Sequence, residues 1–195
     1  MNYLLDLMGS SLIAGILFLL ILKLNLYSSS ANYQSDNELK LQQNAKTLAE
    51  IINHDFRKIG YKCDSTAIIK AEPTRIKFYA DMNEPGTYGS GIIDVVEYYL
   101  GDSTEASGTP NLRDKVMYRI INNVDTTGGP TLGLVDLRFS YLNSSGIATN
   151  YLDSIKYVKA EIWIEPYDQV TDYFTGENDS TVYTYWELTI NPRNI

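Results

Sequence analysis

The sequence is poor in the residues that build catalytic and metal sites. It has one cysteine, Cys63, and one histidine, His54, among 195 residues. A lone cysteine cannot close an intramolecular disulfide, and these two residues cannot assemble a zinc site by themselves. His54 precedes Asp55, but neighbours on a helix point to different faces, so we do not expect a catalytic dyad. No GxSxG, GxGxxG, P-loop or HExxH pattern occurs. We therefore predict that the protein is no enzyme and needs no metal or cofactor.

Basic residues are also scarce. The chain has 16 Lys and Arg residues and 24 Asp and Glu residues, which gives a formal net charge of −8. Such a surface repels phosphate backbones, so we expect no nucleic-acid partner. One acidic cluster has a spacing that does not match a calcium loop. We interpret it as a solvated loop, with a calcium site as the alternative; its members are Asp168, Asp172, Glu177 and Asp179.

Proline is absent before Pro73, and charge is nearly absent from residues 3–22, where Asp6 is the only charged residue. About 20 apolar residues are what a helix needs to cross a membrane. A removed signal peptide would begin with basic residues, and none precedes this run. We therefore favour a retained membrane helix over a signal peptide, and over the buried helix of a soluble protein. A carboxylate in the first turn of that helix would be favoured by the helix dipole.

The chain then changes to an amphipathic helical pattern. Leu41, Leu48 and Asp55 are spaced by seven residues. The pattern predicts one near-continuous helix over residues 4–59, with a bend allowed at residues 28–30 and a stop at Gly60. One stripe of this helix should pack on a folded domain, through Leu48, Ile51, Ile52, Phe56 and Ile59.

Short runs rich in Val, Ile, Tyr, Phe and Trp follow, separated by clusters of Gly, Pro, Asn, Asp and Ser. In IKYVKAEIWI, apolar residues alternate with others, so that Val158, Ala160, Ile162 and Ile164 share one side. This pattern predicts an antiparallel sheet with one face on the helix and one face in water. The predicted fold class is α+β. We expect a transmembrane helix at 1–27, its amphipathic continuation at 28–60, and a β-rich globular domain at 61–195.

Two blocks of the chain resemble one known family. NYLLDLM before an apolar helix is similar to the opening FTLIELM of type IV pilins and pseudopilins, with Asp6 at the place of the family's glutamate. LQQNAKTLAEIINHDFRKIGYKC resembles the corresponding segment of PilW/PulJ-type minor pilins. Later runs agree in order, from VVEYYLGD and VMYRIIN to the closing WELTINPRNI, so the resemblance covers most of the chain.

The resemblance implies a pilin-like fold and a structural role. The chain would be a minor pilin or pseudopilin of a type IV pilus-like or type II secretion-like filament. Asp6 and Asn2 would act in assembly, with the Asp6 carboxylate pairing with the N-terminal amine of a neighbouring subunit. The protein would cross the inner membrane once, with its C-terminal domain outside the cytoplasm, before it enters a periplasmic or cell-surface filament. The alternative is a monomeric anchored ectodomain that binds a surface ligand.

Overall fold

A computed structural model describes residues 2–63, 66–82, 93–106, 108–128, 132–166, 170–171, 178–179 and 183–195. The chain divides into two compact units, Met1–Lys40 and Leu41–Ile195.

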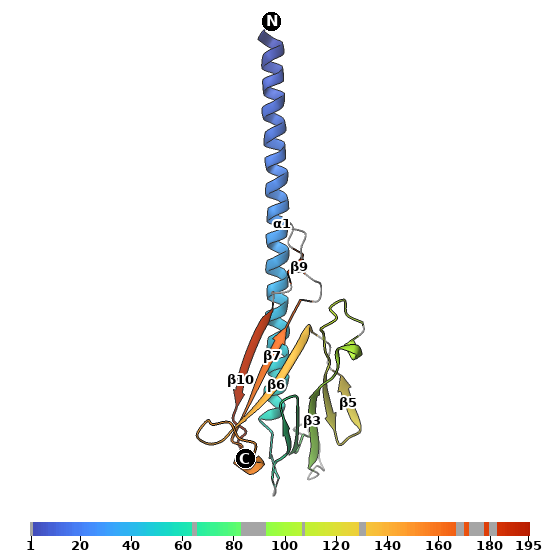
Figure 1. Ribbon diagram of the computed structural model, residues 1–195, viewed down its shortest axis with the longest axis vertical. Coiled ribbons are helices and arrows are strands. Elements are labelled where there is room, and N and C mark those ends of the chain that lie inside the picture. The colour runs from blue at the N-terminus through green and yellow to red at the C-terminus, as the bar shows by residue number, and fades with distance from the viewer. Residues whose placement is uncertain are drawn as a thin grey trace. The chain divides into compact units, whose positions relative to one another are not determined.

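A single helix, α1, runs from Asn2 to Phe56 without interruption (Figure 1). The prediction of one near-continuous helix is therefore confirmed, and residues 28–30 are helical like their neighbours. No proline removes a backbone donor from this stretch. Helix α1 makes up the described part of the first unit and continues into the second.

The second unit holds antiparallel strands arranged in sheets (Figure 1). A five-stranded sheet has the order β1-β2-β3-β4-β5. A three-stranded sheet has the order β10-β7-β6, and the two short strands β8 and β9 pair with each other. The bounds are β1 Ile68–Glu72, β2 Arg75–Ala80, β3 Asp94–Leu100, β4 Met117–Ile121, β5 Asp125–Gly128, β6 Leu134–Leu142, β7 Tyr157–Ile164, β8 Val170–Thr171, β9 Asn178–Asp179 and β10 Thr184–Ile190.

The fold class α+β and the antiparallel pairing agree with the sequence prediction. The alternation in β7 is also confirmed, because Val158, Ala160, Ile162 and Ile164 are fully buried while the residues between them are half-buried. The structure differs in two respects. The predicted single sheet is divided into two main sheets. Strand β5 occupies part of DTTGGP, one of the Gly- and Pro-containing clusters that we expected to separate the strands.

The core of the second unit is formed by the end of α1 and the inner faces of both main sheets. Phe56 lies at the centre of this core. Its ring centroid is 5.7 Å from that of Phe78 on β2, 5.5 Å from Tyr98 on β3, and 5.5 Å from Phe139 on β6. One side chain of the helix thus contacts both sheets. The helical residues that are buried with it are Leu41, Ala45, Leu48, Ala49, Ile52 and Asp55, followed by Ile59 beyond the helix end.

Ile51 corrects the predicted packing stripe. Leu48, Ile52, Phe56 and Ile59 are buried, but Ile51 is 39% exposed. At about 100° per residue, the buried positions cluster around the direction of Ile52, and Ile51 lies about a quarter of a turn to one side. The stripe that was predicted from apolar residues alone was therefore too wide.

Helix α1 ends as the sequence predicted, in a turn around Gly60. Gly60 has a φ of +75°, which glycine adopts without strain, and its N–H donates to the Tyr79 carbonyl oxygen over 2.8 Å. A β-carbon at this position would lie 2.6 Å from the Asn194 carbonyl oxygen. Both the backbone conformation and the packing therefore require glycine here.

Candidate functional site

The first candidate site is the apolar surface of α1 in the first unit. Among the described side chains of residues 3–27, sixteen large apolar ones are exposed, each by at least 43%. Leaving one such side chain in water costs roughly 1.5–3 kcal/mol, so this surface as a whole costs on the order of tens of kcal/mol. In the described residues, α1 is the one helix that is long and apolar enough to cross a membrane. Its surface therefore needs an apolar environment.

Asp6 is exposed on this surface and is its only acidic residue. The helix begins at Asn2, whose side chain lies outside the described residues, so Asp6 belongs to the second turn. We had expected the carboxylate in the first turn. Stabilisation by the helix dipole fades beyond that turn, so the dipole offsets little of the cost of placing Asp6 in an apolar environment.

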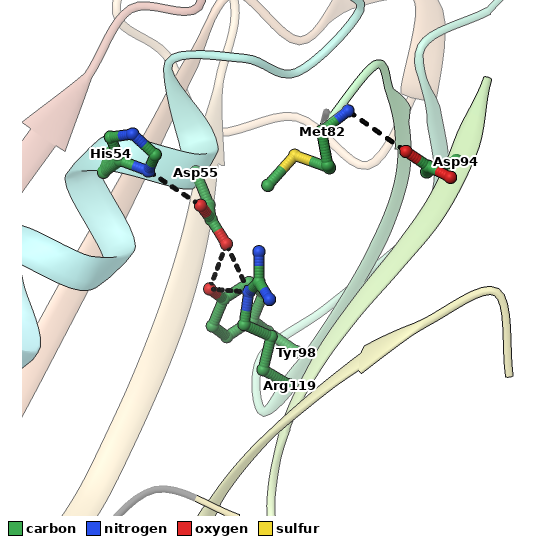
Figure 2. A network of polar contacts seen from close by, with 6 residues as sticks. All are labelled: His54, Asp55, Met82, Asp94, Tyr98 and Arg119. Carbon is green, nitrogen blue, oxygen red and sulfur yellow. Dashed lines mark hydrogen bonds and ion pairs between the residues drawn. The ribbon is translucent and has the colours of Figure 1, made fainter. Parts of the chain in front are cut away.

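The second candidate site is a buried polar network between α1 and the five-stranded sheet (Figure 2). The Tyr98 hydroxyl donates to Asp55 Oδ2 over 2.5 Å, and Arg119 Nε donates to the same oxygen over 2.6 Å. Arg119 Nε also lies 3.1 Å from the Tyr98 hydroxyl oxygen. Tyr98 and Arg119 are cross-strand partners on β3 and β4. The pairing of two strands thus presents a hydroxyl and a guanidinium together to one carboxylate of the helix.

His54 joins this network from the rim. Its Nδ1 lies 3.0 Å from Asp55 Oδ1, although we had expected the two side chains to point apart. The His54 side chain is 68% exposed and that of Asp55 only 5%, so the two do lie on different faces. The short carboxylate at the edge of the buried face is still within reach of the ring. The Asp55 carboxylate and the Tyr98 hydroxyl are buried, and the network joins the helix to the five-stranded sheet.

Electrostatics in the network favour the ionised form of Asp55. Burial alone would raise the pKa of its carboxyl, but hydrogen bonds from Tyr98, Arg119 and His54 outweigh burial and lower the pKa below the usual 3.8. Burial and the neighbouring Asp55 charge raise the pKa of the Tyr98 hydroxyl far above its usual range. Tyr98 therefore remains a hydrogen-bond donor, and the network fixes how the helix meets the sheet.

Replacing Asp55 with Asn is expected to destabilise the second unit by about 1.5–3 kcal/mol, the usual contribution of hydrogen bonds to a charged group. Because the folded-state pKa is lowered, this contribution is fully present above about pH 4 and is lost as the pH falls through the folded-state pKa. Melting of the full chain in a nonionic detergent between about pH 7 and pH 2 measures it. The difference in melting temperature between the parent and Asp55→Asn should become smaller in acid. A matched control is Glu50→Gln, which changes an exposed acid on the same helix. A gap that stays constant down to about pH 2 would contradict the network's assigned role.

Asp114 is a buried carboxylate of a different kind. It is fully buried, and neither carboxylate oxygen has a hydrogen-bond partner. Burial raises the pKa of its carboxyl and the nearby Glu165 charge acts in the same direction, while the neighbouring Thr109 hydroxyl acts in the opposite direction and is outweighed. Burial therefore disfavours the ionised form of Asp114.

The other candidate residues named from the sequence do not form a site in the part of the chain that the structure describes. Asp168, Asp172 and Glu177 lie outside the described residues, and of Asp179 only the backbone in β9 is described. Cys63 is half-buried, and its thiol lies 3.6 Å from the Tyr61 carbonyl oxygen. Among the described side chains, no group of three or more His, Cys, Asp or Glu residues could hold a metal ion.

Comparison with known proteins adds no assignment. No protein-family model, curated protein or solved structure matches the chain.

Proposed function

We propose that this protein is a structural subunit of a filament, of the type IV pilus-like or type II secretion-like kind, and that it assembles through its N-terminal helix. The observation that carries the proposal is the continuous α1, which exposes sixteen large apolar side chains and one carboxylate among the described side chains of residues 3–27. A bilayer provides an apolar environment for such a helix before assembly. A bundle of similar helices provides one afterwards, because side chains of neighbouring helices interdigitate.

Asp6 distinguishes assembly from simple anchoring. An acidic residue in the membrane costs about 2.5–3.5 kcal/mol on insertion scales. In a helix that only anchors the protein, no interaction would offset this cost. In a helical bundle, the same carboxylate can pair with a positive group of a neighbouring subunit, such as its N-terminal amine. The resemblance of the residues around Asp6 to the start of pilin helices supports this role. The C-terminal unit would then lie outside the cytoplasm and face outward from the filament.

The fold of the second unit is compatible with a structural subunit, because its buried polar groups Asp55, Tyr98 and Arg119 hold the helix on the five-stranded sheet. The helix end is clamped between two sheets through Phe56, so a force applied to α1 would be transmitted to the domain.

The experiment is to shear surface filaments from cells that make the protein and to compare its amount in the filament and membrane fractions. We expect the protein in both fractions. Its confinement to the membrane fraction would contradict the proposal and favour the anchored binding module.

A further inference from the structure

The second unit has an open pocket on the outward face of its three-stranded sheet. Its volume is about 520 Å³, within the range of small-molecule sites. Strand register explains its position, because Asp136 on β6, Trp163 on β7 and Tyr185 on β10 form one row across the sheet. The pocket is lined by charged and aromatic side chains, among them Arg113, Asp136, Arg138, Trp163, Glu165 and Tyr183.

The four charged side chains that line the pocket form two ion pairs with one another. Arg113 Nη1 lies 2.7 Å from Glu165 Oε1, and Arg138 Nε lies 2.9 Å from Asp136 Oδ2. The named lining therefore has two positive and two negative groups and no excess charge. Because each named charge already has an internal partner, an ionic ligand would have to compete with that partner for the group it binds.

The pairs still leave many hydrogen-bonding groups for a ligand. A guanidinium has five N–H donors in a fixed fork, and each pair above uses one of them. The carboxylates likewise have acceptor positions beyond the contacts they make. These pairs also hold the donors and acceptors in place, so a ligand would find them preorganised.

Aromatic rings supply the apolar part of the pocket. The Arg138 guanidinium lies 5.3 Å from the centre of the Trp163 ring, and the ring of Tyr185 lies 5.0 Å from Trp163 on the three-stranded sheet. Trp163 is thereby fixed between neighbours. Tyr183 is 59% exposed and adds a second aromatic surface at the pocket. Such rings contact the C–H groups of a ligand while their polar tips stay hydrated.

We propose that this pocket binds a neutral saccharide. A sugar ring carries hydroxyl groups at its rim, which match alternating donors and acceptors, and C–H groups on its faces, which match aromatic surface. It brings no charge, so both ion pairs remain intact. The net charge of −8 further disfavours anionic glycans. This inference does not depend on the proposed assembly role.

The test is a binding measurement on the full chain in a detergent without a sugar headgroup, by saturation-transfer NMR followed by titration. The probes are lactose, maltotriose and N,N′-diacetylchitobiose, with sialyllactose and chitobiose as the charged counterparts. At least one neutral probe should bind with a Kd of about 1 mM or tighter, and its charged counterpart, where one is included, at least tenfold more weakly. No signal from any neutral probe at about 10 mM, or equal binding of a charged counterpart, would overturn the proposal.

Variants locate the binding. Tyr183→Ala removes an exposed ring, and Arg138→Met removes donors from a side chain that is 61% exposed while keeping an apolar stem near Trp163. Each should weaken binding of the neutral probe at least tenfold, and Tyr183→Ala should do so without lowering the melting temperature. The control is Tyr151→Ala, which removes a ring that is 79% exposed and does not line the pocket. An unchanged Kd in either pocket variant would place the binding elsewhere and overturn the assignment.

Discussion

Replacing Asp6 with Ala is expected to reduce incorporation into filaments at least tenfold. The substitution would leave a positive group of the neighbouring subunit unpaired in an apolar bundle, where such a charge costs several kcal/mol, and about 1.4 kcal/mol already corresponds to a factor of ten. Asp6→Glu should largely restore incorporation, because it keeps the charge, and glutamate is the usual occupant in the pilins that this segment resembles. The measurement is the ratio of protein in the sheared filament and membrane fractions.

The Asp6 variants separate assembly from insertion and folding. Removing a charge makes membrane insertion easier, so the membrane fraction should not fall. Asp6 also lies in the first unit, whereas the buried core begins at Leu41 in the second. The melting temperature of the second unit should therefore stay unchanged. Ser11→Ala is the matched control, because it alters an exposed polar residue of the same helix. Among the described contacts, the Ser11 hydroxyl donates only to the Met8 carbonyl oxygen in the preceding turn. Equal incorporation of Asp6→Ala and the parent would remove the charge-pairing role.

Replacing Phe56 with Ala is expected to destabilise the second unit by about 3–5 kcal/mol, the usual cost of truncating a buried aromatic ring. The expected value lies high in that range because Phe56 is fully buried and its ring contacts rings from both main sheets. The melting temperature of the full chain in detergent should fall by roughly 10 °C.

Ile51→Ala is the matched control for Phe56→Ala. It truncates an apolar side chain of the same helix, five positions earlier, that is 39% exposed. It should change stability by less than about 1 kcal/mol. Similar losses for both variants would show that the buried face of α1 is assigned to the wrong side.

The sequence was most informative where a physical period extends over many residues. The absence of proline and the change from uniformly apolar to amphipathic spacing predicted α1 to within three residues of each end. Strict alternation predicted which residues of β7 are buried. The division into two sheets was not predictable in this way, because alternation defines the two faces of a strand and says nothing about which strands pair.

The Asp55 network had a signal in the sequence that we did not use. Asp55 shares a seven-residue spacing with Leu41 and Leu48, and both of those residues are buried. An acidic residue on a buried stripe requires a partner. Its partners could not be named from sequence, because the pairing of β3 with β4 that brings Tyr98 beside Arg119 is a long-range contact. Ile51 shows the opposite case, in which an apolar residue near the stripe was assigned to the core although its angle places it outside.

The most direct test of the proposed assembly is photo-cross-linking from Ile16, which lies within the apolar part of α1 and is 51% exposed. A benzoylphenylalanine residue at this position reacts with any C–H group in contact with it. In sheared filaments, we expect cross-links to the N-terminal helix of a neighbouring subunit, identified by mass spectrometry of the cross-linked peptides. In the membrane fraction, we expect mainly cross-links to lipid. Cross-links to lipid alone in every fraction that contains the protein would contradict assembly through this helix.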